Sequence, residues 1–203
     1  SDEVQRAIDC GADVIMLPFF KTVAEVEQFL SAVKGRVKTS LLFESAEAVG
    51  RAEQILSIRE YDEVHFGLND LRIGLGLDFL FESFAGGLID WLCSLAKKYE
   101  KSFGIGGVGK IGKELLPAEL VIQEHVRLGS ERVILSRVFH QEAKSLKELH
   151  EKVNLRAEIQ KVREVEERAR ARSAAQVIQD RKSFVEAVQA ASKRFSKGAF
   201  IRG

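Results

Sequence analysis

Short apolar runs alternate with amphipathic stretches along the first two thirds of the chain. Five of these runs predict strands, at residues 14–17, 41–43, 64–66, 103–105 and 133–135. Apolar residues at helical spacing predict helices over 4–9, 23–33, 46–58, 81–99 and 117–128. Strands that are continuously apolar are typical of sheets covered on both faces, and their alternation with helices favours right-handed crossovers in a parallel sheet. The pattern therefore predicts an α/β fold.

The number of strands leaves two architectures open. A closed (β/α)₈ barrel needs eight strands, and the pattern gives five. The chain is then either an open five-stranded sheet or the last five βα units of a TIM-type barrel, in which case about three strands would precede Ser1.

Glycine usage separates a loop-rich first part from a helical second part. Fourteen of the sixteen glycines lie at or before Gly129, and none occurs from 130 to 197. We expect a partial barrel carrying the site over 1–140 and a helical arm over 141–203, with a break near Arg172 and Ser173. The charged, amphipathic arm must pack on something to be stable. Either it lies on its own domain, or it docks on a partner subunit and serves oligomerisation.

Composition excludes several classes of function. A net charge of +1 does not favour nucleic acid or an anionic membrane as a partner, and no apolar run approaches the ~18 residues of a spanning helix. Two cysteines, Cys10 and Cys93, cannot form a disulfide framework, so we expect a cytoplasmic protein.

Two carboxylates come directly after neighbouring predicted strands. Glu44 follows the strand at 41–43, and Asp70 follows the strand at 64–66 in the segment Gly67-Leu68-Asn69-Asp70. The carboxyl ends of parallel strands form the active face of such folds, and two carboxylates with water are a common Mg²⁺ or Mn²⁺ site. The alternative is that both residues are helix N-caps.

Small and basic residues follow the last two predicted strands. Residues 104–109 match G-x-G-x-x-G, but the next helix begins only near Pro117, so a dinucleotide site is the weaker interpretation. We expect Gly106 and Gly107 to let the backbone approach a substrate, or else to form a plain turn. Arg137 is a possible catalytic residue that faces an anionic substrate, or else forms a salt bridge to a neighbouring loop.

Taken together, these segments resemble the HpcH/HpaI aldolase and citrate lyase β-subunit superfamily of phosphoenolpyruvate/pyruvate-type barrels. The resemblance is carried, in family order, by residues 11–18, 41–48, 62–71, 103–107, 124–130 and 134–137.

The resemblance implies a fold, a metal and a reaction. Glu44 and Asp70 fall on the family's ligands for Mg²⁺ or another divalent ion, and backbone N–H groups near Leu68 and Asn69 on its binding site for the substrate carboxylate. The implied activity is carbon–carbon lyase (aldolase-like) chemistry on a 2-keto acid through a pyruvate-type enolate, and the implied assembly is a homo-oligomer. The alternative is a non-catalytic barrel for ligand binding or assembly. By the family pattern, the enolate-stabilising Arg and the His-containing base region would precede Ser1.

Overall fold

The computed structural model describes residues 2–112 and 116–199. The chain divides into two compact units, Ser1–Gly106 and Gly107–Gly203. The expected boundary near residue 140 stays a prediction.

Five strands form one sheet in which the order of the strands is their order along the chain. They are β1 (Val14–Leu17), β2 (Lys38–Phe43), β3 (Glu63–Phe66), β4 (Ser102–Val108) and β5 (Arg132–Leu135). Pairing is parallel from β1 through β4, with Leu17 beside Leu41 and Phe43 beside Phe66. A sequential order without reversal is that of a barrel, because a doubly wound sheet changes direction at a switch point. The partial TIM-barrel fold class is confirmed.

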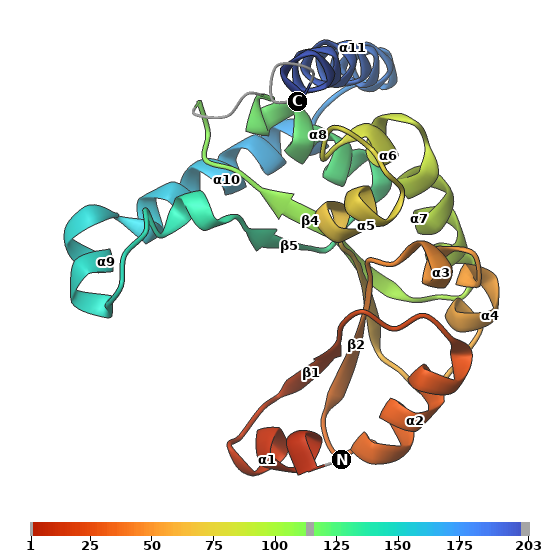
Figure 1. The fold of residues 1–203 in the computed structure, drawn as a ribbon. Helices are drawn as coiled ribbons and strands as arrows, with labels where there is room; N and C mark the ends of the chain where they lie inside the picture. The colour runs from red at the N-terminus through yellow and green to blue at the C-terminus, as the bar shows by residue number, and fades with distance from the viewer. Residues whose placement is uncertain (1, 113–115, 200–203) are drawn as a thin grey trace. The chain divides into compact units, whose positions relative to one another are not determined.

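Seven helices are described in the first unit. They are α1 (Asp2–Asp9), α2 (Val23–Val33), α3 (Ala46–Val49), α4 (Ala52–Leu56), α5 (Leu68–Gly74), α6 (Glu82–Ala85) and α7 (Leu88–Lys98). Figure 1 shows α2, α4 and α7 along one side of strands β1 to β3. A capping box begins α2, in which the Thr22 side chain accepts from the Glu25 N–H and the Glu25 carboxylate accepts from the Thr22 N–H.

Three predictions for these helices were wrong in detail. The predicted helix over 46–58 is interrupted at Gly50 and Arg51. The predicted helix over 81–99 is interrupted at Gly86 and Gly87, where Gly87 has φ 88°, a conformation that glycine adopts without strain. Residues 68–74, for which no helix was predicted, form α5.

Phenylalanine rings from neighbouring segments pack in series through the core of the first unit. Phe20 meets Phe43 edge-on at 5.0 Å between centroids, Phe43 meets Phe66 at 5.9 Å, and Phe66 meets Phe103 at 6.1 Å. Phe43 and Phe66 are fully buried. Offset and edge-on pairs of this kind stabilise a core beyond their buried area, so the ends of β2 and β3 are firmly placed.

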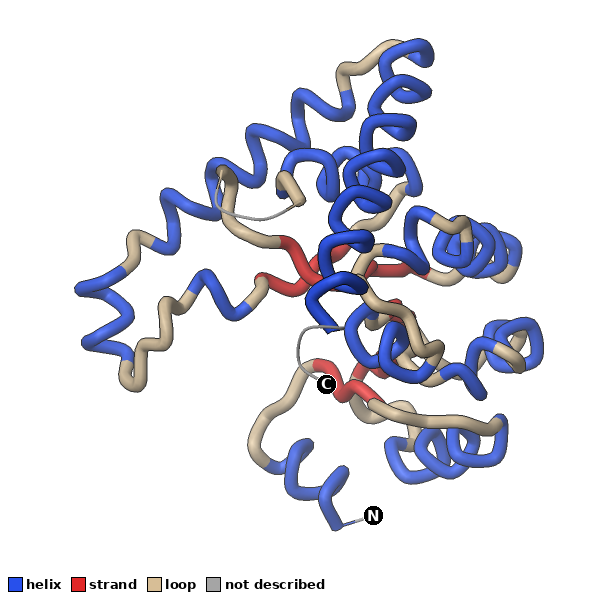
Figure 2. The backbone as a smooth tube through the Cα atoms, turned by 45° about the horizontal axis from the view of Figure 1, so that its top comes forward, coloured by secondary structure: helices blue, strands red, loops and turns tan. Residues whose placement is uncertain are grey.

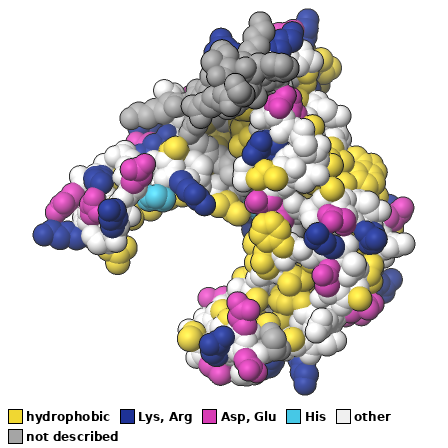
Figure 3. Space-filling model, viewed as in Figure 1, with side chains coloured by type: hydrophobic (Ala, Val, Ile, Leu, Met, Phe, Trp, Pro, Cys, Tyr) yellow, Lys and Arg dark blue, Asp and Glu magenta, His cyan; other side chains and the backbone are white. Residues whose placement is uncertain are grey.

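Strand β1 lies at one end of the strand order and leaves apolar side chains exposed. Val14 is 43% and Met16 38% exposed. Figure 3 shows hydrophobic side chains on the viewed surface of the first unit, in the region where Figure 1 shows the strands of that unit. Among residues 2–112 and 116–199, no strand pairs with the outer edge of β1.

The second unit contains β5 and a series of helices. They are α8 (Ala118–Leu128), the 3₁₀ helix η1 (Arg137–Phe139), α9 (Leu146–Lys152), α10 (Leu155–Arg170) and α11 (Ala174–Ala199). The predicted break near Arg172 is the turn between α10 and α11, which Figure 2 shows as a short connection. A second break separates α9 from α10, where Asn154 caps α10. Pro117 precedes the first turn of α8 instead of lying within it.

Helices α10 and α11 pack on α8 within their own unit. Val162 and Val165 of α10 join Ala118 and Ile122 of α8 in one apolar cluster. Of the two interpretations of the arm, the one in which it lies on its own unit therefore describes α10 and α11. A role of the arm in oligomerisation stays a prediction.

None of the helices in the described part of the chain is long and apolar enough to cross a membrane.

Candidate metal site

Glu44 lies directly after β2 and is nearly buried, with 6% of its surface exposed. Its Oε1 accepts a hydrogen bond from the backbone N–H of Phe19 at 3.0 Å. Burial raises the pKa of this carboxyl group above its ordinary value, the Phe19 N–H opposes that effect, and repulsion from the Asp70 carboxylate raises the pKa further. The side chain is thus a desolvated carboxyl group that one backbone N–H holds in place.

Gly67, the residue after β3, makes room for Glu44. A Cβ atom at Gly67 would lie 3.0 Å from the Glu44 Cβ and 3.1 Å from its Oε2, closer than ordinary van der Waals contact. The absence of a side chain at this position therefore lets the chain after β3 pass close to the Glu44 side chain at the end of β2. The second oxygen, Oε2, lies on the side of Gly67, where α5 begins.

Asp70 lies in the first turn of α5 and is half-buried. Its effect on the pKa of Glu44 shows that the structure brings the two carboxylates into electrostatic reach of each other. Neither is a helix N-cap, so that alternative was wrong. The cap of α3 is Ser45, whose Oγ accepts from the Ala48 N–H at 3.1 Å, and α5 begins after Gly67.

The pair fits a hard divalent cation by the chemistry of its donors. Mg²⁺ and Mn²⁺ prefer carboxylate oxygens and keep several water or substrate positions open. A cation would relieve the mutual repulsion of two carboxylates in a partly desolvated site. In the described ranges no group of three or more Asp, Glu, His or Cys side chains could hold a metal ion, so an ion bound here would have these two carboxylates as its protein ligands.

Two further predicted residues, Leu68 and Asn69, open α5 beside the pair. The first N–H groups of a helix have no acceptor within the helix. The Leu68 side chain is buried and the Asn69 side chain exposed. Their assignment to the substrate carboxylate stays a prediction.

The two glycines predicted to bind substrate have close neighbours of their own. A Cβ at Gly106, whose φ is +35°, would lie 2.6 Å from the Leu68 Cδ1, so packing alone requires glycine there. Its carbonyl oxygen lies 3.1 Å from the His65 Nε2. Gly107 belongs to the second unit, where a Cβ would lie 3.3 Å from the Ile134 carbonyl oxygen. Substrate binding by these glycines stays a prediction.

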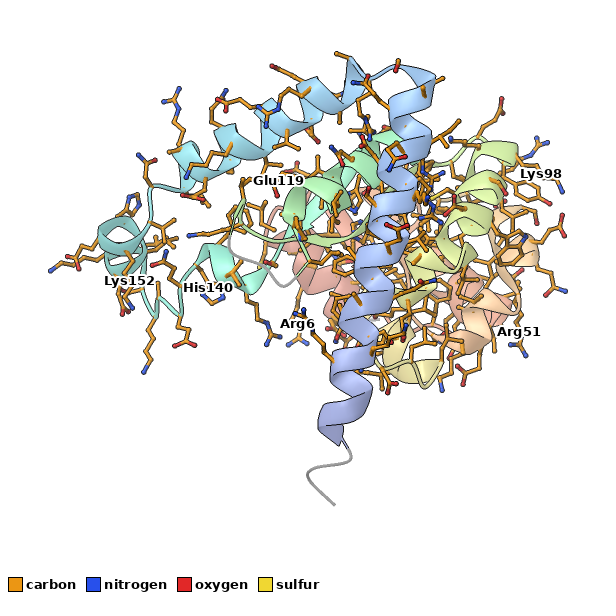
Figure 4. The ribbon with its side chains drawn as sticks, turned by 90° about the horizontal axis from the view of Figure 1, so that it is seen from above. Arg6, Arg51, Lys98, Glu119, His140 and Lys152 are labelled. Carbon is orange, nitrogen blue, oxygen red and sulfur yellow. The ribbon has the colours of Figure 1, made fainter. Side chains whose placement is uncertain are left out.

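Arg137 also belongs to the second unit. It is exposed in η1 and, with His140, lines an open hollow of about 680 Å³. Figure 4 labels His140 on the segment that follows η1. The catalytic role of Arg137 stays a prediction.

Sequence reasoning missed the role of Phe19, as it missed that of Gly67. Phe19 contributes a backbone N–H to Glu44, and a backbone N–H is present at every position except proline, so no residue pattern identifies it. The Pro18 that precedes it signals only the end of β1.

Comparison with known proteins gives matches among solved structures. No protein-family model matches the chain, and no curated protein matches its sequence. The structure of RipC from Yersinia pestis matches with a TM-score of 0.58 and 14% identity over 87% of this chain and 73% of that one.

Two further solved structures match the chain, an aldolase and a protein with a bound ion and ligand. An HpcH/HpaI aldolase from Desulfitobacterium hafniense DCB-2 matches with a TM-score of 0.54 and 17% identity, over 76% of this chain and 70% of that one. Protein CitE from Mycobacterium tuberculosis, in complex with magnesium and pyruvate, matches with a TM-score of 0.56 and 11% identity, over 91% of this chain and 69% of that one. The chain therefore shares the fold of these solved structures, among them an HpcH/HpaI aldolase and the protein CitE.

Proposed function

We propose that this protein is a carbon–carbon lyase that depends on a divalent metal ion and acts on a 2-oxo acid through a pyruvate-type enolate. The observation that carries the proposal is the nearly buried Glu44 carboxylate, held by a backbone N–H and in electrostatic reach of Asp70 at the ends of adjacent strands. The complex of the similar CitE structure with magnesium and pyruvate supports the choice of ion and substrate class.

The proposal assigns a role to each residue of the candidate site. Glu44 and Asp70 would hold Mg²⁺ or Mn²⁺, which when bound acts as a Lewis acid toward the negative charge that develops on the oxo acid. The N–H groups of Leu68 and Asn69 bind the substrate carboxylate. In the cleavage direction the C4 hydroxyl loses its proton as the C3–C4 bond breaks, and C4 leaves as an aldehyde or ketone. The electron pair of the broken bond stays with the oxo acid as its enolate, and a proton then returns to C3.

Enolisation can be measured without knowing the second product. Pyruvate in D₂O should lose its methyl proton signal in NMR spectra when the full-length protein and Mg²⁺ are both present. Glu44→Ala and Asp70→Ala should each abolish the exchange, because each removes half of the ion's protein ligands.

A matched control lies three residues along the chain. Glu47 is exposed and pairs with Lys21 at 2.9 Å, so Glu47→Ala removes an equal charge from the same segment and should leave exchange unchanged. No exchange by the wild-type protein at saturating Mg²⁺, or equal exchange by Glu44→Ala, would reject the proposed activity.

The alternative is a non-catalytic role in ligand binding or oligomeric assembly. Large apolar side chains that a partner could cover in the second unit include Leu146 of α9, which is 75% exposed, and Ile178 of α11, which is 73% exposed. Under this alternative, Leu146→Glu with Ile178→Glu dissociates a homo-oligomer in sedimentation experiments, and no variant or wild-type protein enolises pyruvate.

We also propose a reducing, cytoplasmic setting. The chain has only two cysteines, of which Cys10 is exposed and Cys93 buried, and such sparse use of cysteine is usual in that compartment.

A further inference from the structure

Phe19 has a backbone conformation that its residue type disfavours. Its φ is +51°, in the left-handed region where a side chain crowds the backbone and where bulky residues are outliers. Conformations of this kind persist only where the surrounding structure holds them, and they concentrate at functional sites.

Burial of the ring does not compensate for this conformation. The Phe19 side chain is 60% exposed, whereas the adjacent Phe20 is 2% exposed and packs against Phe43. What Phe19 does contribute to the interior is its N–H, which donates to the Glu44 Oε1 at 3.0 Å.

A second hydrogen bond ties the same turn to the same strand end. The Ser45 hydroxyl donates to the Phe20 carbonyl oxygen at 2.8 Å. The two bonds run in opposite directions between consecutive residues, from Phe19 to Glu44 and from Ser45 to Phe20. The turn after β1 and the end of β2 are thereby fixed to each other.

We propose that Phe19 is a positioning residue for the metal site: its left-handed backbone directs an N–H at one oxygen of Glu44 and so presents the other, Oε2, to the cation. The inference rests on the proposed metal site and extends it to a residue that does not touch the ion. Groups that orient the ligands of a metal affect its affinity by about 10- to 100-fold.

Two substitutions at Phe19 distinguish the effect of its backbone conformation from the effect of its ring. Phe19→Gly and Phe19→Val both remove the aromatic side chain. Glycine adopts positive φ freely, whereas a β-branched residue is disfavoured there more than phenylalanine. We expect Phe19→Gly to bind Mn²⁺ within about twofold of wild type and Phe19→Val about 10-fold more weakly. Phe19→Ala should lie between them, and it serves as the test if the valine variant does not fold.

Lys34 offers a matched control in the same unit. It has φ +55°, ends α2, and donates its N–H to the Leu30 carbonyl oxygen rather than to Glu44. Lys34→Gly and Lys34→Val therefore repeat the same backbone comparison away from the site. We expect their midpoints of urea unfolding to differ as those of the Phe19 variants do, with unchanged Mn²⁺ affinity.

The experiment is a Mn²⁺ titration of each variant followed by electron paramagnetic resonance, with urea unfolding in parallel. Equal Mn²⁺ affinity of the glycine, alanine and valine variants at Phe19 would overturn the inference, as would an equal loss of affinity in Lys34→Val. If wild-type protein binds no Mn²⁺, the metal site and the proposed function fail with it. Binding by wild type without a difference among the Phe19 variants overturns the positioning role alone.

Discussion

Adding one methyl group at Gly67 tests the close packing on which the candidate site depends. The new Cβ would lie 3.0 Å from the Glu44 Cβ and 3.2 Å from the Leu42 Cδ1, where ordinary contacts lie at 3.4–4 Å. Overpacking of this kind costs about 1–3 kcal/mol. Gly67 has φ −80°, which alanine adopts without strain, so reduced freedom of the unfolded chain returns about 0.4–1 kcal/mol. Taking the middle of each range, Gly67→Ala should lower the free energy of unfolding by about 1 kcal/mol.

The same substitution seven residues later is the control. A Cβ at Gly74, the last residue of α5, would lie 3.6 Å from the Ala46 nitrogen and 3.9 Å from the Ala46 Cβ, which is ordinary contact. Gly74→Ala should leave stability unchanged or raise it by up to about 1 kcal/mol. Urea unfolding measures both variants, and Mn²⁺ titration should show weaker binding for Gly67→Ala alone. Equal stability and equal Mn²⁺ affinity of the two variants would falsify the packing argument.

Two other predictions concern buried carboxylates. Because burial and a neighbouring carboxylate raise the pKa of Glu44 above 4.5, the folded metal-free protein binds this proton more tightly than the unfolded chain does. Its stability relative to Glu44→Gln should therefore fall as the pH rises from 4.5 through the raised pKa, and thermal melts that run parallel at all pH values would contradict this. In the second unit, Glu124 is 1% exposed and accepts hydrogen bonds from Arg127 and Arg181, each at 2.7 Å. Glu124→Gln should lower the free energy of unfolding, measured in urea, by about 3 kcal/mol. Glu186→Gln, at an exposed residue of α11, should lower it by less than about 0.5 kcal/mol. Equal losses in the two variants would refute the role given to burial.

Sequence pattern was sufficient where an element has a periodic signal and a clear end. The strand at 14–17 and the helix at 23–33 have the predicted bounds, since Pro18 ends the first and Thr22 caps the second. The pattern failed for α5, because a helix of seven residues with two buried leucines, Leu68 and Leu71, has too few turns to show a period. It also predicted one continuous helix across Gly50 where the structure has α3 and α4, because apolar spacing continues on both sides of a single glycine.

The residues of the candidate site also differ in how far the sequence could predict their positions and roles. The proximity of Glu44 and Asp70 could be predicted because residues that follow neighbouring parallel strands meet at one edge of a sheet. The roles of Phe19 and Gly67 could not be predicted, since one acts through a main-chain N–H and the other through the absence of a Cβ. Both depend on which segments meet in three dimensions.

Calorimetric titration of the wild-type protein with Mg²⁺, in the presence of pyruvate, tests the central claim most directly. We predict one ion bound per chain, with binding lost in Glu44→Ala and in Asp70→Ala and retained in Glu47→Ala. Absence of binding at millimolar Mg²⁺, or binding that both site variants retain, would contradict the assignment of these two carboxylates as the ligands of a catalytic metal ion.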